Sequence, residues 1–316
     1  GAGAAGGPRF DVSVPPGGYV WWYVDALSED GRHGLSIIAF IGSVFSPYYA
    51  FARRRGPAEP LDHCALNVAL YGPGVGRWTM TERGRRHVAV EPHRFVIGPS
   101  ALHWDGETLT IAIEEIGMPL PIPRRVRGMV RVRPKAVTDH VVTLNPLGNH
   151  RWWPIAPIST VEVDLSEPGL RWQGPGYLDM NQGDVPIADG FRDWHWSRAN
   201  TRRGAAVLYG GTRRNGSAFD YGWGFDEAGT ATAFTPPPIA HLRKSGWRIA
   251  RETRGDTGRP AELVETLEDT PFYARSLVRT HLGGEPVTAM HESLSLDRFR
   301  SPVVQAMLPF RMPRRG

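Results

Sequence analysis

Two short segments near the middle of the chain contain the residues best suited to chemistry. The segment HRWW begins at His150, and the segment GYLDMNQGD begins at Gly176. Residues two apart share a face in extended chain, so His150 and Trp152 are expected to point one way, and Tyr177 and Asp179 likewise. If both segments face one cavity, it holds an imidazole, an indole, a phenol and a carboxylic acid, the groups of acid–base chemistry.

Spacing alone leaves a structural alternative open. Paired tryptophans are more often part of a core than catalytic, and Tyr177 could be an ordinary buried tyrosine with a bonded hydroxyl. Asp179, which precedes Asn181, could form a turn, and His150 could lie on the surface. A second aromatic and polar segment, Asp193–Arg198 (DWHWSR), is open to the same two interpretations, with packing favoured.

Composition and hydrophobic alternation predict an all-β chain. Among the 316 residues are 37 Gly and 28 Pro. That density interrupts long helices and favours many short strands joined by tight turns. Period-two alternation predicts half-buried strands at 64–71, 108–113, 130–133 and 161–165. Hairpin turns are expected at Asp105–Gly106 and Asn215–Gly216.

A single β-domain of this length would be large, so two domains are the simpler prediction. A proline-rich stretch from Pro154 to Gly176 separates two strand-rich halves. We therefore expect an N-terminal β-domain over 8–170 and a C-terminal β-domain over 171–313, each a barrel or a sandwich. The one helix expected is short and terminal, within Pro302–Leu308.

Charge and cysteine content narrow the possible classes of protein. A net charge of +5 and a pI of about 9.6 would suit nucleic acid or an anionic membrane. The charge is spread along the chain, however, and no nucleic-acid-reading motif is present. The single cysteine, Cys64, excludes an intrachain disulfide and a cysteine-based zinc site. The scattered histidines argue against a dedicated metal site, although folding could bring three of them together. The best apolar run, Leu35–Phe45, is shorter than the roughly 18–20 residues that span a bilayer.

Six segments of the chain are long and unusual enough to indicate a family. They are residues 17–50, 63–72, 150–157, 176–184, 266–277 and 285–299. In these segments the chain resembles the carotenoid 1,2-hydratases of purple bacteria, also called hydroxyneurosporene synthases. The resemblance covers nearly the whole chain and implies two lipocalin-like β-barrel domains in tandem, which agrees with the strand pattern.

The resemblance also implies an activity and a set of functional residues. The reaction would be hydration of the end-group double bond of an acyclic carotenoid such as neurosporene or lycopene, without a cofactor. The family's His-x-Trp and Tyr-x-Asp pairs match His150, Trp152, Tyr177 and Asp179. Neighbouring residues expected to bind substrate are Trp153, Asn181 and Trp196.

Chemistry explains why these residue types belong together. An isolated alkene is a very weak base, so its hydration needs a proton at one carbon and a tertiary cation at the other. Asp179 is the expected acid, held protonated near neutral pH by burial, well above its reference pKa of about 3.9. Trp152 and Tyr177 would offer π-faces to the cation. His150 would either orient water and accept its proton or hydrogen-bond Asp179, and the sequence leaves both roles open.

A carotenoid dissolves in lipid rather than water, so the resemblance further implies peripheral contact with a membrane. The apolar stretch Val44–Phe51, followed by Arg53–Arg55, is one expected contact surface. The alternative is that Leu35–Phe45 is a buried strand and the arginines lie on a solvated turn. The expected location is the cytoplasmic side of the inner or intracytoplasmic membrane, and no oligomeric state is predicted.

Two other functions remain open on the sequence alone. One is a pericyclase or isomerase on the same scaffold, which would not need Asp179 as a proton donor. The other is a non-catalytic carrier of carotenoid or lipid, which would bind its ligand without adding water.

Overall fold

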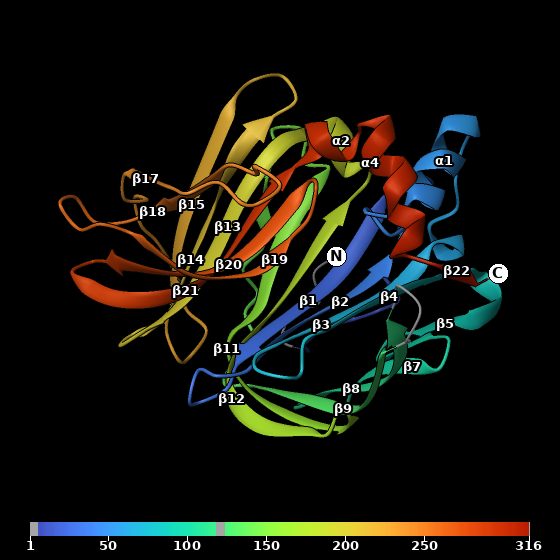
Figure 1. The fold of residues 1–316 in the computed structure, drawn as a ribbon, viewed down its shortest axis with the longest axis horizontal. Coiled ribbons are helices and arrows are strands. Elements are labelled where there is room, and N and C mark those ends of the chain that lie inside the picture. Colours follow the sequence, from blue (N-terminus) through green and yellow to red (C-terminus); the bar gives the residue numbers. More distant parts are fainter. Residues whose placement is uncertain (1–5, 118–123, 316) are drawn as a thin grey trace. The chain divides into compact units, whose positions relative to one another are not determined.

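The computed structural model describes residues 6–117 and 124–315, and most of these residues lie in β-strands (Figure 1). The strands form two large curled sheets and one separate hairpin. The predicted all-β class, with two lipocalin-like domains in tandem, is therefore confirmed. The chain divides into two compact units, of which the first comprises Gly1–Ile187 with Ala306–Gly316 and the second Ala188–Gln305.

The first unit is one sheet of 13 strands within the described residues. In sheet order its strands are β22 (Arg314–Arg315), β4 (Arg77–Arg83), β3 (Cys64–Tyr71), β2 (Gly34–Ile41), β1 (Tyr19–Leu27), β12 (Leu170–Gly183), β11 (His150–Glu167), β9 (Arg124–Pro134), β8 (Leu109–Gly117), β7 (Ser100–Trp104), β6 (Arg94–Ile97) and β5 (Val88–Glu91), with β10 (Val142–Thr143) beside β11. Neighbours run antiparallel except β22, which is parallel to β4. The boundary predicted at residue 170 falls in the hairpin between β11 and β12, inside this unit.

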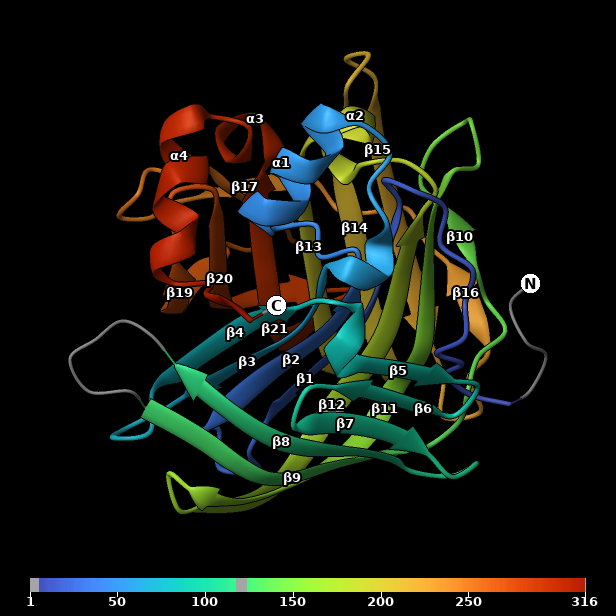
Figure 2. The same ribbon diagram turned by 90° about the vertical axis from the view of Figure 1, so that its right-hand side faces the viewer.

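The large sheet curls until strands that are distant in sheet order meet. Arg83 on β4 donates from Nη2 to Oε2 of Glu115 on β8 over 2.9 Å, and both side chains are buried. Ser100 on β7 donates to the other carboxylate oxygen over 2.8 Å. Figure 2 shows β8 and β9 crossing β1 to β4 as a second layer.

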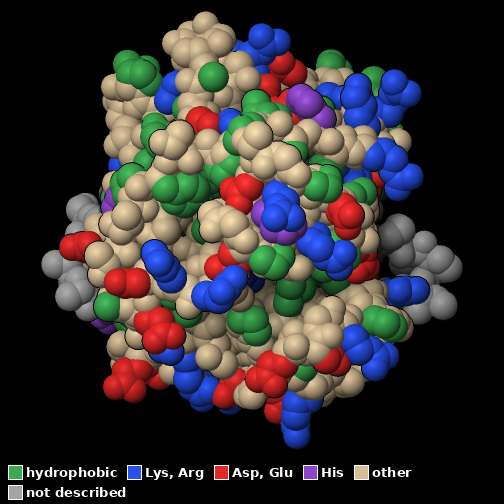
Figure 3. Space-filling model, turned by 90° about the vertical axis from the view of Figure 1, so that its left-hand side faces the viewer, with side chains coloured by type: hydrophobic (Ala, Val, Ile, Leu, Met, Phe, Trp, Pro, Cys, Tyr) green, Lys and Arg blue, Asp and Glu red, His purple; other side chains and the backbone are tan. Residues whose placement is uncertain are grey.

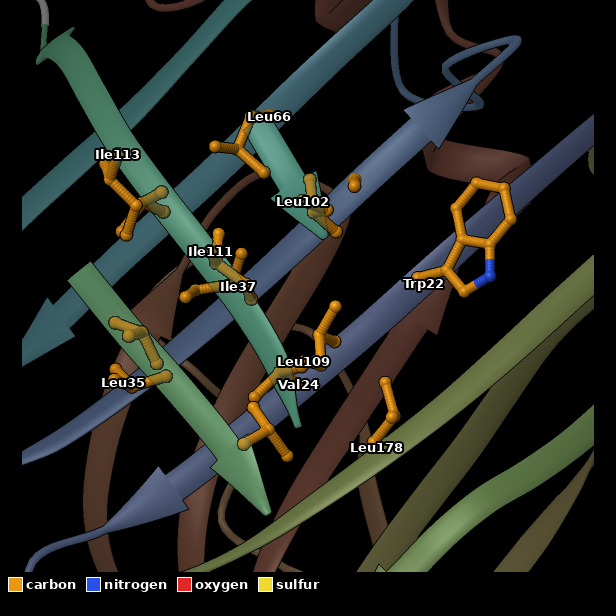
Figure 4. Close-up of a cluster of buried hydrophobic side chains, with 14 of the residues drawn as sticks. Trp22, Val24, Leu35, Ile37, Leu66, Leu102, Leu109, Ile111, Ile113 and Leu178 are labelled. Atoms are coloured by element: carbon orange, nitrogen blue, oxygen red, sulfur yellow. The ribbon is translucent and has the colours of Figure 1, made fainter. Parts of the chain in front are cut away.

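The hydrophobic core of this unit lies between the two layers of the curled sheet. Figure 4 shows Leu109, Ile111 and Ile113 of β8 pointing toward Val24 on β1 and Ile37 on β2. These side chains come from alternate positions, as the period-two pattern requires. The predicted strand at 64–71 is β3, and the predicted strands at 108–113, 130–133 and 161–165 lie within β8, β9 and β11, apart from Thr108.

Strand β1 is buried on both faces, and this positions the site described below. Val20, Trp22 and Val24 point into the core, whereas the alternate residues of β1 point to the opposite face. All nine residues of the strand except Leu27 are buried. A strand buried on both sides is expected to be almost continuously apolar, so polar side chains on its second face need internal partners.

The second unit has a sheet of seven strands and a separate two-stranded hairpin among its described residues. The sheet contains, in order, β16 (Ala231–Ala233), β15 (Ala218–Phe225), β14 (Gly204–Arg213), β13 (Phe191–Thr201), β21 (Glu285–Ser295), β20 (Tyr273–Leu282) and β19 (Glu262–Asp269). The hairpin pairs β17 (Ile239–Leu242) with β18 (Arg251–Arg254). Both predicted hairpin turns are present, with Gly106 at φ 103° and Gly216 at φ 88°.

The helices and single turns of helix are short. They are α1 (Pro47–Arg55), η1 (Pro60–Asp62), η2 (Arg85–His87), α2 (Ile187–Gly190), α3 (Leu296–Phe299), α4 (Pro302–Met307) and η3 (Leu308–Phe310). The short terminal helix predicted within Pro302–Leu308 is α4. Among the described residues, no helix is both long and apolar enough to cross a bilayer.

Helix α1 changes the expectation for the three arginines. Ser46 caps it by accepting a hydrogen bond from the Tyr49 amide, and Pro47 occupies its first turn. Arg53–Arg55 therefore form the last turn of a helix rather than a loop turn, while most of the apolar run before them is β2, a buried strand.

Figure 3 shows one face of the molecule, on which acidic and basic side chains are interspersed.

Candidate active site

The β11–β12 hairpin brings the two chemistry-bearing segments together. In its register His150 lies opposite Gly183, and Trp152 lies opposite Asn181. Directly opposed residues share a face, and residues two apart on one strand share it too. His150, Trp152, Tyr177, Asp179 and Asn181 therefore line one face of the sheet, opposite the face that packs in the core.

Asp179 is held by the side chains expected beside it. Its carboxyl group is buried, with 3% of the residue exposed. The indole Nε1 of Trp152 and the hydroxyl of Tyr177 both donate to its Oδ2, each over 2.9 Å. One carboxyl oxygen thus accepts two hydrogen bonds, from the adjacent strand and from its own strand.

Tyr177 acts as a hydrogen-bond donor because its proton is firmly held. The residue is fully buried, and burial is the largest cause that raises the pKa of its hydroxyl well above 10. The hydrogen bond to Asp179, and the charge of Asp179 whenever that carboxyl group is ionised, raise this pKa further. The hydroxyl therefore stays protonated throughout the pH range in which a protein is folded.

His150 lies at the other end of the same face. Its Nδ1 is 3.0 Å from the hydroxyl of Tyr19, and the two rings stack with centroids 5.9 Å apart. Burial lowers the pKa of His150 to about 4, so the ring is neutral near pH 7. The opposing residue, Gly183, is four positions beyond Asp179, or about 13 Å along the strand. The imidazole is thus next to Tyr19 and well separated along the sheet from the carboxyl of Asp179.

Strand β1 supplies site residues that the sequence analysis did not identify. Its register with β12 places Tyr23 opposite Asp179 and Asp25 opposite Tyr177. Asp25 is fully buried, and the hydroxyl of Tyr23 donates to its Oδ2 over 2.9 Å. Tyr23 also meets Tyr177 edge to face, with centroids 6.2 Å apart. The signal that could have indicated these residues is the repeated spacing, since Tyr-x-Asp occurs on both strands.

The other expected substrate-binding residues lie in different places. Asn181 is buried on the same face as Asp179, opposite Trp21 of β1. Trp153 lies on the opposite face, in the hydrophobic core, where its indole donates to the carbonyl of Thr138 over 2.9 Å. Trp196 is a buried residue of β13 in the second unit.

The chemistry available on this face is that of carboxyl, phenol, indole and imidazole groups. Within residues 6–117 and 124–315, no group of three or more His, Cys, Asp or Glu side chains is placed to hold a metal ion. The buried Cys64 lies on β3, where burial raises the pKa of its thiol. The face can therefore transfer protons and stabilise charge through fixed donors.

Comparison with known proteins identifies the family. The family model described as "Carotenoid hydratase CrtC" matches residues 37–316. The acyclic carotenoid 1,2-hydratase of Thiocapsa roseopersicina is 60% identical over 317 residues, which cover 100% of this chain and 78% of that protein. The hydratase of the same name from Rubrivivax gelatinosus is 54% identical over 98% of this chain and 77% of its own length.

Among solved structures, the chain is similar to an AttH protein from Nitrosomonas europaea. The TM-score is 0.58 at 14% identity, and the match covers 88% of this chain and 92% of that one. A likeness at this identity shows the fold alone. The match to the family model and the two hydratases go further, and the chain therefore belongs to the CrtC family of carotenoid hydratases, which are enzymes of the hydro-lyase class.

Proposed function

We propose that this enzyme adds water across the terminal 1,2 double bond of acyclic carotenoids such as neurosporene and lycopene, with Asp179 as the acid. The names of its relatives support the substrate class and the bond. One observation supports the acid: a buried carboxyl group whose Oδ2 accepts hydrogen bonds from both Trp152 and Tyr177.

The two donors decide which oxygen carries the proton. Because Oδ2 of Asp179 accepts from an N–H and an O–H, the proton of the neutral acid belongs on Oδ1. In the proposed reaction the alkene π-pair takes this proton at C2, and the electrons of the O–H bond stay on the carboxylate. The tertiary cation at C1 is then captured by a lone pair of water, which loses a proton to give the alcohol.

Burial and hydrogen bonding act on Asp179 in opposite directions. Burial disfavours the charged carboxylate and so keeps Asp179 protonated. The hydrogen bonds from Trp152 and Tyr177 stabilise the carboxylate that remains after transfer, which makes the acid stronger when substrate is present. We therefore infer that Trp152 and Tyr177 act in two ways. Their N–H and O–H groups donate to Asp179, and their rings offer π-faces to the cation.

Because His150 lies beside Tyr19, several residues along the sheet from Asp179, we assign it a structural role and no part in proton transfer to the alkene. A neutral imidazole can hold the hydroxyl of Tyr19 in place, and the ring of Tyr19 in turn stacks on Trp21. His150 therefore positions both rings at the end of the site away from Asp179. Trp21 lies between this end and Asp179, opposite Asn181. In this assignment His150 orders the wall of the site along which water and the carotenoid end group lie.

Asp179→Asn should abolish hydration while the fold is kept. The amide matches the carboxyl in shape but delivers no proton, so we expect a loss of at least roughly 10²-fold. The measurement is the mass of the carotenoid after incubation with lycopene in detergent, since hydration adds one water. Asp164→Asn, an exposed carboxylate on the neighbouring strand β11, is the matched control and should remain active. Near-normal turnover by Asp179→Asn would refute the assignment.

Trp152→Phe and Tyr177→Phe separate the two ways in which these residues can act. Each variant keeps an aromatic face but removes one donor to Asp179, and a hydrogen bond to a charged group contributes about 1.5–3 kcal/mol. We expect each to lower the hydration rate by roughly 10- to 100-fold. If both variants kept the wild-type rate, the rings alone would suffice, and the donor role would be wrong.

His150→Gln should change how stability depends on pH. The pKa of His150 is lowered from 6.5 to about 4 in the folded chain, so the unfolded chain takes up this proton first as the pH falls. Between about pH 6.5 and about pH 4 the wild type should therefore lose about 3 kcal/mol more of its free energy of unfolding than the variant. Urea unfolding at both pH values measures this, and an equal loss in both proteins would contradict it.

We further propose that α1 contacts the membrane from which the carotenoid is taken. Of the expected stretch, Val44 and Tyr49 are buried, but Phe51 is 52% exposed. The guanidinium of Arg55 lies 4.2 Å from the centroid of the Phe51 ring, and Arg54 is also exposed. An exposed aromatic ring among arginines suits the headgroup region of an anionic bilayer.

Replacing Arg53, Arg54 and Arg55 by Ser should weaken flotation with vesicles of phosphatidylcholine and phosphatidylglycerol. At about 1 kcal/mol for each arginine near an anionic surface, binding should fall roughly 100-fold. The control replaces three exposed arginines of β6 and β9, namely Arg94, Arg125 and Arg127. Unchanged flotation of the α1 variant would exclude this surface.

A further inference from the structure

The site contains the same short pattern twice, in opposite directions. Tyr23-x-Asp25 on β1 and Tyr177-x-Asp179 on β12 are aligned so that each tyrosine lies opposite the aspartate of the other strand. In both patterns the tyrosine hydroxyl donates to Oδ2 of the aspartate on its own strand, over 2.9 Å. The antiparallel pairing therefore places two equivalent, hydrogen-bonded carboxyl groups on one buried face.

The two carboxyl groups are close enough to influence each other. They are diagonal neighbours across the β1–β12 pair, a relation that puts the backbones about 7–8 Å apart. Asp25 is fully buried and Asp179 is 3% exposed. Each of them, when ionised, raises the pKa of Tyr177, which lies between them. Two neighbouring carboxyl groups on one buried face can divide the roles of proton donor and proton acceptor.

The groups that face Asp25 from the neighbouring strands are neutral. On β2 its partner in register is Ser36, which is fully buried and within 3.0 Å of the Tyr71 hydroxyl. On β12 its partner is Tyr177.

We propose that Asp25 is the second carboxyl group of the reaction, the base that takes the proton from the attacking water. This inference rests on the proposed function, in which Asp179 protonates the alkene. An acid and a base that are neighbours on one face form the pair that addition of water requires.

The step balances in atoms and electrons. Asp179 gives its proton to C2 and becomes a carboxylate, and the alkene π-electrons form the new C–H bond. A water lone pair forms the C1–O bond, and one O–H bond of that water breaks, with its proton going to Asp25 and its electrons staying on oxygen. The product is the tertiary alcohol. Transfer of the proton from Asp25 back to Asp179 then restores the starting state.

Asp25 fits the role of base better than His150 does. Gly183, the residue opposite His150, lies about 13 Å from Asp179 along the backbone of β12, and the imidazole stacks on Tyr19. The cation at C1 forms next to the carbon that receives the proton, so the attacking water must lie near Asp179. Asp25 is the diagonal neighbour of that residue.

Capture of the cation by azide tests the proposal. Azide is an anion and needs no base, so it reports on cation formation alone. Asp25→Ala, which also leaves room for azide, should lose hydration by roughly 10²–10⁴-fold but form the 1-azido adduct from lycopene when sodium azide is added. Both products are distinguished by mass. Asp25→Asn, a closer match in shape, should lose hydration to the same extent, and circular dichroism and thermal melting check that both variants fold.

The outcomes separate this inference from the proposed function. Asp164→Asn, the exposed carboxylate on β11, is again the control and should hydrate like the wild type. Hydration by both folded Asp25 variants within a few-fold of wild type would overturn the inference, as would a folded Asp25→Ala that forms neither product. Asp179→Asn should form neither product with or without azide. If Asp179→Asn hydrates lycopene instead, the proposed function fails, whatever the Asp25 variants do.

Discussion

The paired hydrogen bonds to Oδ2 of Asp179 are the interaction on which the account of this site depends. The donors are the indole N–H of Trp152 on β11 and the hydroxyl of Tyr177 on β12, the strand that also carries Asp179. A buried carboxyl group without such donors would be a weak acid that cannot stabilise its own conjugate base. With them, the group can hold a proton in an apolar setting and still release it to a reactive partner.

The fold provides this arrangement by burying both faces of its central strands. Consecutive residues point to opposite faces, so Trp153 packs in the core while Trp152 reaches Asp179. The same alternation sends Trp22 into the core and leaves Tyr23 in the site. Curling of the large sheet, fixed in part by the Arg83–Glu115 pair, closes the core on one side and leaves the second face for chemistry.

Local patterns in the sequence were sufficient to predict the strand class and to place Tyr177 and Asp179 on one face. That Trp152 joins them was expected only if both segments face one cavity, and the choice of these residues as a site came from the family resemblance. Two-residue spacing places side chains on one face whatever the rest of the fold does. It does not specify which distant strand lies alongside, and so Asp25 was missed, because the pairing of β1 with β12 joins segments more than a hundred residues apart. Helix α1 was missed for a different reason, since its apolar beginning continues the pattern of the strand before it.

The proposed reaction requires that the carboxyl group of Asp179 is neutral before substrate binds. Infrared difference spectroscopy of the wild type against Asp179→Asn at neutral pH tests this directly. We expect a carbonyl band of a protonated carboxyl group that is present in the wild type, shifts in D₂O and is missing from the variant. A difference spectrum that contains only carboxylate bands would show that Asp179 is ionised at rest, and would contradict the account.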